Sequence, residues 1–470
     1  MGRERAALSA PSASLVAPAI VPALLLFCVA TALIFLLYPQ LAVRDADGFA
    51  YIIGARSLHD GHGYRSLIGE PLNHWPPGYS LILSPFQDSI LAAKILNYCS
   101  FGATIGLLYF LLRRSSWSWQ SSLGLTLVLG SGFFRLLANS AHADILTYAL
   151  FLAGLLAILE FRERRLFPAV IWALLIPVKL IAVVFLPPAL AADFFVCRRN
   201  AFELLRTYAP GVFVSIAAVL SVLIFDIATT QTWISPSHEE PSLANLVSEL
   251  RSFVVSIPRE FFFSWHGSIA ETVPSVAFLS CMVFAAISLF SLRPAPELRW
   301  LLAYGVFCLL CCALLLGVRS YIPTVRLVGY GLIVLLLAFR PLKRANSVWL
   351  LYGFASLGIG VANALTVDSL GSMDPRYAEL AAQVSGYAKS EEPVATNSFY
   401  ILDLNANVPS VPIKNLGEAT NYSQLLWITL PNYDPGSATI SPLPHPNSEW
   451  CEQKQFTGAI LFRRCNPLQR

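Results

Sequence analysis

Residues 15–51 read LVAPAIVPALLLFCVATALIFLLYPQLAVRDADGFAY, and this stretch decides the fold class. It joins an apolar run at 15–38, long enough to cross about 30 Å of hydrocarbon, to a loop that opens with acidic residues. The run is longer than the apolar part of a typical signal peptide, and no small-residue cleavage site closes it before Tyr38 and Pro39. The sequence therefore predicts a retained membrane helix followed by a polar exterior loop.

The composition of the whole chain agrees with this interpretation. Hydrophobic residues make up 56% of the 470 residues and charged residues 13%, whereas soluble domains are roughly a quarter charged. The formal net charge is only +4, and no block rich in lysine and arginine occurs, which excludes a nucleic-acid-binding class. The sequence predicts an all-α polytopic membrane protein.

Further apolar runs indicate the other membrane helices. The run at 167–196 is too long for one helix and has Pro177, Val178 and Lys179 in its middle, so we expect two short helices that meet at Lys179. With this split, about eleven transmembrane segments are expected. The remaining runs cover residues 89–112, 118–138, 142–160, 207–227, 274–292, 299–318, 324–340 and 346–366.

Basic residues between the runs predict the orientation, because lysine and arginine concentrate in short cytoplasmic loops. They fall in alternate loops, which places the N-terminus in the cytoplasm. The long loops 39–88 and 228–273 and the region from 367 then lie outside, together with all seven histidines. The predicted domains are a transmembrane domain at 1–366 and an extracytoplasmic domain at 367–470. Chemistry is therefore expected on the extracytoplasmic face.

The region after residue 366 has the pattern of a small α+β domain. A helical spacing from Tyr377 to Tyr387 is followed by strand-like stretches at 393–399, 423–430 and 456–463. Cys451 and Cys465 allow at most one disulfide here. A structural cap on the membrane domain is the alternative role for this region.

The first exterior loop is too rich in polar and aromatic residues to be a mere connection. It begins Arg44-Asp45-Ala46-Asp47-Gly48-Phe49-Ala50-Tyr51 and ends His74-Trp75-Pro76-Pro77-Gly78-Tyr79. The apolar positions between residues 49 and 58 predict an amphipathic helix, which the Asp60-Gly61 turn would end. The two prolines would direct the chain back to the membrane.

Charged residues also occur at the outer ends of the membrane segments. Asp144 opens the run at 142–160, where a carboxylate could serve only the helix dipole. Lys179, Arg319 and Arg326 lie where ionisable groups are costly unless they face a partner or a cavity. Such a set of ammonium and guanidinium donors suits an anionic lipid headgroup such as a phosphate; snorkelling to the interface is the alternative.

The first exterior loop resembles that of the GT-C-fold glycosyltransferases that use polyprenyl-phosphate sugars, most closely the protein O-mannosyltransferase and lipid A aminoarabinose transferase branch (family 39-like). The residues that carry the resemblance, in the family's order, are Asp47, Tyr51, Arg56, Gly61 and Pro76-Pro77.

The resemblance implies that Asp47 is the catalytic carboxylate, with Asp45 as the second choice. It also implies roles for Asp144 and Lys179, and a lipid-phosphate site near Arg319 to Arg326. The acidic pair is split as Asp45-Ala46-Asp47 and Gly48 follows it, which leaves open both the identity of the base and any metal requirement.

The implied function is transfer of a sugar from a polyprenyl-phosphate donor to a hydroxyl-bearing lipid, glycan or protein, in a bacterial inner membrane, with no cofactor signature in the sequence. A transporter or lipid flippase with an exterior cavity is the alternative, although internal repeats and charges at the bilayer centre are not evident. The candidate substrate-binding residues are Tyr51, Arg56, Tyr64, His74, Trp75, His142, Asp144, Lys179, Arg319, Tyr321 and Arg326.

Overall fold

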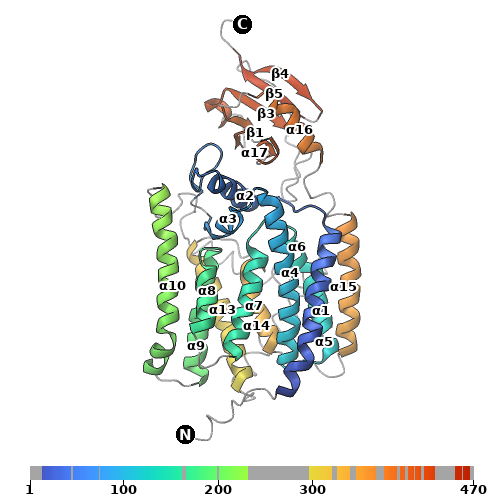
Figure 1. Cartoon of the computed structure of the whole chain (residues 1–470), viewed down its shortest axis with the longest axis vertical. Helices are drawn as coiled ribbons and strands as arrows, with labels where there is room; N and C mark the ends of the chain where they lie inside the picture. Colours follow the sequence, from blue (N-terminus) through green and yellow to red (C-terminus); the bar gives the residue numbers. More distant parts are fainter. Residues whose placement is uncertain are drawn as a thin grey trace. The chain divides into compact units, whose positions relative to one another are not determined.

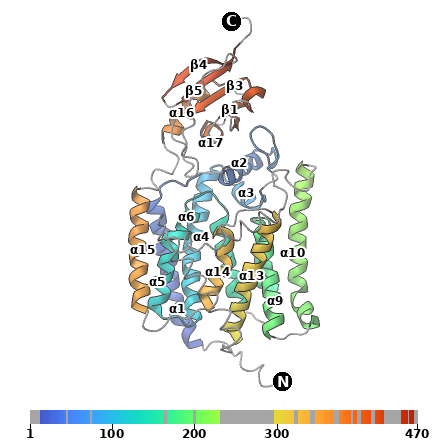
Figure 2. The ribbon, with the colours of Figure 1, turned by 180° about the vertical axis from the view of Figure 1, so that it is seen from behind.

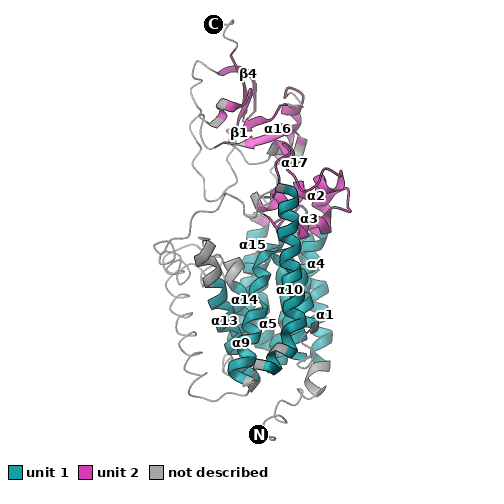
Figure 3. Ribbon diagram, turned by 90° about the vertical axis from the view of Figure 1, so that its left-hand side faces the viewer, with its two compact units in different colours: residues 1–39, 95–139, 143–364 teal, residues 40–94, 140–142, 365–470 magenta. Residues whose placement is uncertain are grey.

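The computed structural model shows two compact units (Figure 3), formed by residues 1–39, 95–139 and 143–364 and by residues 40–94, 140–142 and 365–470. The predicted boundary at residue 366 stays a prediction. The structure describes residues 13–43, 46–72, 75–160, 166–197, 201–230, 296–319, 325–338, 346–366, 375–388, 392–396, 401–406, 408–413, 418–428, 450–457 and 459–465.

The first unit is helical, and its helices run side by side in both Figure 1 and Figure 2. Within the described residues, five helices are long and apolar enough to cross a membrane. Most helices match an apolar run of the sequence; the run at 274–292 lies outside the described residues. The helices are α1 (Ala13–Leu37), α4 (Ser89–Arg114), α5 (Trp119–Leu129), α6 (Arg135–Ala138), α7 (Asp144–Glu160), α8 (Leu166–Leu175), α9 (Leu186–Cys197), α10 (Ala201–Thr230), α13 (Pro296–Arg319), α14 (Val325–Ala338) and α15 (Asn346–Thr366). The start of α4, residues 89–94, and the end of α15, residues 365–366, belong to the second unit.

Glycines allow close helix contacts in this unit. A Cβ added to Gly124 of α5 would lie 2.1 Å from the carbonyl oxygen of Trp349, and one added to Gly353 of α15 would lie 2.6 Å from that of Gly124. The backbones of α5 and α15 therefore touch, as small residues permit in membrane bundles.

The predicted break at Lys179 is present. Helix α8 ends at Leu175, Lys179 has an extended backbone (φ −153°, ψ 118°), and the 3₁₀ helix η3 (Leu180–Val184) leads into α9. The backbone NH of Lys179 still donates to the carbonyl of Leu175 at 2.8 Å. A basic side chain is thus presented from a discontinuity in the membrane unit.

The run at 118–138 differs from the single helix that its hydropathy predicts. A π-helical turn, η2 (Gly130–Phe134), separates α5 from α6. Ser131 lies in this turn and its hydroxyl donates to the carbonyl of Leu127 at 2.7 Å. Such single π turns inside helices are frequent at functional sites.

In the second unit, the first exterior segment forms two helices, α2 (Ala46–His59) and α3 (Gly78–Leu83). The predicted helix at 49–58 is α2, and the chain turns immediately after it at Gly61, whose φ of +77° favours glycine. Pro77 directly precedes α3. The same unit contains a parallel bridge between Ala42 and Ser140.

The C-terminal part of this unit holds a five-stranded sheet in the order β2-β1-β3-β5-β4. The first three strands are parallel, and β5 is antiparallel to both β3 and β4. Strands β1, β3 and β5 lie in the stretches predicted as strands, whereas β2 and β4 are not anticipated by the sequence pattern. The elements are α16 (Pro375–Ser385), β1 (Val394–Thr396), α17 (Ile401–Ala406), β2 (Ser410–Pro412), η6 (Glu418–Asn421), β3 (Gln424–Ile428), β4 (Trp450–Phe456) and β5 (Ala459–Arg464).

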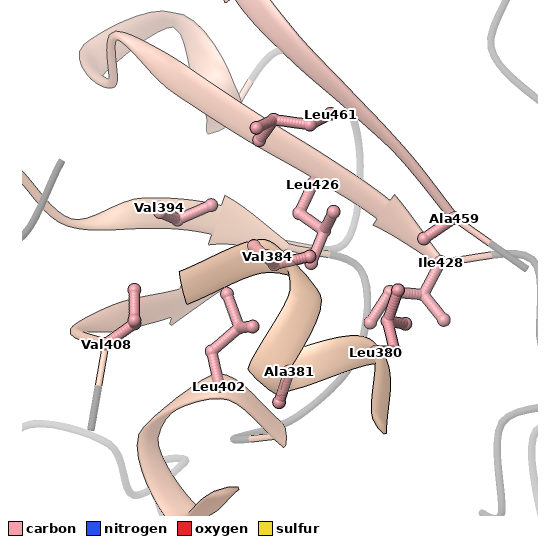
Figure 4. Close-up of a cluster of buried hydrophobic side chains, with 10 residues drawn as sticks. All are labelled: Leu380, Ala381, Val384, Val394, Leu402, Val408, Leu426, Ile428, Ala459 and Leu461. Atoms are coloured by element: carbon pink, nitrogen blue, oxygen red, sulfur yellow. The ribbon is translucent and has the colours of Figure 1, made fainter. Parts of the chain in front are cut away.

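The helices α16 and α17 cover one face of this sheet. Figure 4 shows Leu380, Ala381 and Val384 of α16 packed with Leu402 of α17 against side chains of the strands. These α16 residues are three of those whose spacing predicts the helix. A disulfide joins Cys451 of β4 to Cys465 at the end of β5, with a Cα–Cα distance of 5.1 Å.

Candidate functional site

Asp47 lies in the first turn of α2, where the helix dipole favours a negative charge. Its Oδ1 accepts a hydrogen bond from the indole Nε1 of Trp75 at 2.9 Å. Both residues are half-buried. The carboxylate is therefore held by a neutral donor from a distant part of the same loop.

Two contacts fix α2 against α3. The hydroxyl of Ser80 donates to the carbonyl oxygen of Tyr51 at 2.9 Å. The rings of Tyr51 and Tyr79 meet edge to face with their centroids 5.1 Å apart, a favourable geometry for aromatic pairs. Because Tyr51 lies one helical turn after Asp47, these contacts also fix the start of α2.

Tyr64 packs against α2 at Gly54. Its side chain is buried, and a Cβ added to Gly54 would lie 2.2 Å from its Cε2. The carbonyl oxygen of Tyr64 accepts a bond from the backbone NH of Leu72 at 3.2 Å. The position of Tyr64 indicates a structural contact with α2, where the sequence suggested a substrate contact.

Arg56 lies in the last turn of α2, near Asp60 and Asp88. Burial lowers the pKa of its guanidinium, and the two carboxylates oppose that effect. An arginine remains charged even so. Nearby, His59 Nδ1 lies 2.9 Å from the carbonyl oxygen of Ser84, so the end of α2 is anchored as well as its start.

Asp144 and Lys179 form an ion pair in the first unit. Asp144 occupies the first turn of α7, and its side chain is only 1% exposed. Lys179 approaches from the break between α8 and η3. A buried carboxylate needs such a partner, because an isolated buried charge is very costly.

A second buried polar cluster was not among the sequence candidates. Arg135 is buried and donates to the hydroxyl of Tyr38 and, from Nε, to the carbonyl oxygen of Ser131 at 2.7 Å. The hydroxyl of Tyr98 contacts the carbonyl oxygen of Tyr38 at 3.1 Å and Oδ1 of Asn139 at 3.3 Å. The only signal for this cluster in the sequence is an arginine inside an apolar run.

Residues 40–42 and 140–142 run side by side in the second unit. The backbone NH of Ala141 donates to the carbonyl oxygen of Ala42 at 2.9 Å. His142 is buried, and its backbone NH donates to the carbonyl oxygen of Ser140 at 2.7 Å. The two short segments of the second unit are therefore bonded to one another through their backbones.

The remaining candidates are not described in atomic detail. Asp45, His74 and Tyr321 lie outside the described residues. Arg319 ends α13 and Arg326 lies in the first turn of α14, but their side chains are outside the description. Their assignment to a lipid-phosphate site therefore stays a prediction. Among the described residues, no group of three or more His, Cys, Asp or Glu side chains has the arrangement of a metal site.

Comparison with protein families identifies the chain. The model of glycosyltransferase family 87 matches residues 73–316, which is more than half of the chain. The chain belongs to glycosyltransferase family 87. This membership establishes a glycosyltransferase and disfavours the transporter alternative. No curated protein matches the chain in sequence.

Solved structures show the fold of this family 87 member. ArnT from Cupriavidus metallidurans in the apo state is 14% identical with a TM-score of 0.52, covering 93% of this chain and 97% of ArnT. The oligosaccharyltransferase of Archaeoglobus fulgidus, tethered with an acceptor peptide, is 11% identical with a TM-score of 0.51, covering 87% of this chain and 69% of that chain. ArnT from the same organism bound to undecaprenyl phosphate is 13% identical with a TM-score of 0.47, covering 95% of this chain and 98% of that ArnT chain.

The family 87 match, together with the likeness to apo ArnT and to the oligosaccharyltransferase, bears out the GT-C resemblance. The family 87 member is thus a helical integral-membrane glycosyltransferase.

Proposed function

We propose that this family 87 member transfers a sugar from a polyprenyl phosphate to a hydroxyl-bearing acceptor at the extracytoplasmic face, with Asp47 as the general base. The observation that carries the proposal is the Asp47 carboxylate, held at the start of α2 by the indole of Trp75 at 2.9 Å. A general base must be positioned before its basicity matters. The positioned carboxylate therefore supports the role that the loop motif implies.

In the proposed step, Asp47 accepts the proton of the acceptor hydroxyl as that oxygen bonds to the anomeric carbon. The bond from the anomeric carbon to the phosphate oxygen breaks, and its electron pair leaves with the lipid phosphate. Attack opposite the leaving group inverts the anomeric carbon. Apart from proton transfer, the main task of the protein is to stabilise the charge that develops on the phosphate.

Lys179 is the described basic residue that we assign to this phosphate, with Arg319 and Arg326 as further candidates. Its Nζ now pairs with Asp144, and its side chain is 15% exposed. Asp144 orients the ammonium, and the phosphate would compete for the same donor. ArnT, whose fold this chain shares, has been solved with undecaprenyl phosphate bound, which supports a polyprenyl-linked donor.

The proposed location is a bacterial inner membrane, with the N-terminus in the cytoplasm and the C-terminal region in the periplasm. The distribution of arginine and lysine between the loops favours this orientation. The Cys451–Cys465 disulfide gives independent support, because disulfides persist in the periplasm and are rare in the cytosol.

The test is sugar transfer in reconstituted membranes supplied with radiolabelled polyprenyl-phosphate hexoses. Asp47→Asn should lower transfer by roughly 10²- to 10⁴-fold, the usual contribution of a general base. Glu70→Gln is the matched control in the same loop, because Glu70 is exposed, and it should keep wild-type transfer. Asp45→Asn separates the two acidic candidates. Full transfer by Asp47→Asn at equal protein levels would overturn the proposal.

A further inference from the structure

We propose that Trp75 is a positioning residue for the catalytic base, an inference that rests on the proposed role of Asp47. Sequence reasoning assigned Trp75 to a sugar or acceptor contact. The structure instead directs its indole Nε1–H at Oδ1 of Asp47, 28 positions earlier in the chain, at 2.9 Å. An indole offers one donor and no acceptor, so this bond imposes a single direction on the carboxylate.

The main chain is restrained on both sides of Trp75. Its own NH donates to the carbonyl oxygen of Leu72 at 3.3 Å, and Leu72 is buried. Pro76 and Pro77 follow, and a residue before proline is restricted to extended conformations. The backbone of Trp75 is therefore restrained by contacts that do not involve Asp47.

The partner is fixed as well. Asp47 belongs to α2, which the Ser80–Tyr51 hydrogen bond ties to α3. Helix α3 begins three residues after Trp75, so one short segment supplies both the indole for Asp47 and the anchor for the next turn of α2. The segment from Trp75 to α3 thus bonds to α2 twice, through the indole of Trp75 and through the hydroxyl of Ser80.

The bond orients the base without consuming its ability to accept a proton, because a carboxylate has about four lone-pair sites on two oxygens. A donor to the charged form also favours that form. Removal of the indole N–H should therefore leave the Asp47 carboxylate less well oriented. It should also raise the pKa of Asp47, so that the carboxyl group stays protonated to a higher pH.

The decisive experiment compares transfer by the full-length protein in reconstituted membranes across pH 4.5 to 8.5. Trp75→Phe keeps an aromatic ring and removes the donor. It should lower kcat roughly ten- to a hundredfold and move the acid limb of the kcat/KM profile to higher pH by about one unit. Trp75→His, which restores a ring N–H, should recover part of kcat and return the limb toward wild type.

Trp300→Phe is the matched control. The indole of Trp300 also donates to a carboxylate, Oδ1 of Asp193 at 2.7 Å, and both residues belong to the first unit, outside the loop. The same chemical change there should leave the acid limb of the profile in place.

Two results would overturn the positioning role while leaving the glycosyltransferase proposal intact. One is a Trp75→Phe variant with an unshifted limb and wild-type kcat. The other is a raised KM with unchanged kcat and limb, which would mark a substrate contact. Full transfer by Asp47→Asn would instead remove the proposed base, and the role of Trp75 with it.

Discussion

Asp47 and Asp144 both open a helix, yet their surroundings differ. Asp47 is half-buried and accepts a bond from a neutral indole, whereas Asp144 is buried and pairs with the ammonium of Lys179. A buried carboxylate paired with a partly buried cation is suited to holding that cation. A half-buried carboxylate is better suited to the proton transfer that we propose for Asp47.

Asp403 in α17 extends the comparison to a third environment. It is buried like Asp144, but its carboxylate accepts bonds only from neutral groups among its described partners, the backbone NH and the hydroxyl of Ser410. Burial raises the pKa of Asp403 to about 6, against the opposing effect of these bonds. The three aspartates thus occupy three different environments. Asp144 is buried beside a cation, Asp403 is buried with neutral described partners, and Asp47 is partly exposed.

The largest expected effect tests the Asp144–Lys179 pair. Lys179→Met leaves a buried carboxylate without its cation and should destabilise the protein by about 3–5 kcal/mol. The double variant Asp144→Asn with Lys179→Met removes both charges and should recover most of that loss. Thermal unfolding in detergent measures both. Equal stability of Lys179→Met and wild type would show that the pair is not a structural unit.

The next largest effect tests how the burial of Asp403 changes the stability of the protein with pH. The raised pKa of Asp403 means that its protonated form stabilises the fold below about pH 4 and that this contribution is lost as pH rises through about 6. Asp403→Asn mimics the protonated form, so it should gain about 2–3 kcal/mol over wild type at pH 8 and little at pH 4. Unfolding measured across this range checks the prediction, and a pH-independent difference would contradict it.

A smaller effect tests how α2 is placed. Gly54→Ala drives a methyl group to 2.2 Å from the Tyr64 ring, which should cost about 1–3 kcal/mol and reduce transfer by displacing Asp47. Gly358→Ala in α15 is the control, because nothing lies within 4 Å of its added Cβ. Stability and transfer should be measured together. Loss of neither would mean that α2 does not depend on Tyr64.

The smallest effect on stability belongs to Asp47. Asp47→Ala removes the hydrogen bond from Trp75 to a half-buried carboxylate, and we expect a change of about 1 kcal/mol in the free energy of unfolding. The same variant should lose transfer. Asp144→Ala, in contrast, should lose several kcal/mol, so a large destabilisation by Asp47→Ala would remove the distinction between the two carboxylates.

Much of the helical architecture could be predicted from the sequence, because apolar run length and proline placement are local signals. The break at Lys179 follows from Pro177 and run length, and the helix at 46–59 follows from its apolar spacing. The π turn at Gly130–Phe134 was not predicted, because hydropathy averaged over the run does not register it, although Gly130, Ser131 and Gly132 are residue types at which helices become irregular. Strand β4 was missed because its residues alternate weakly and lie in a polar region.

The sequence by itself determined the membrane class, the broken helix and the acidic exterior loop, because hydropathy, charge and proline act over neighbouring residues. Tertiary structure decided which charges and donors meet. Trp75 reaches Asp47, Lys179 reaches Asp144 and Arg135 reaches Tyr38 across 28, 35 and 97 positions of the chain. Such pairings depend on how helices pack, because the partners come from distant parts of the chain, and no local pattern of hydropathy or charge encodes them.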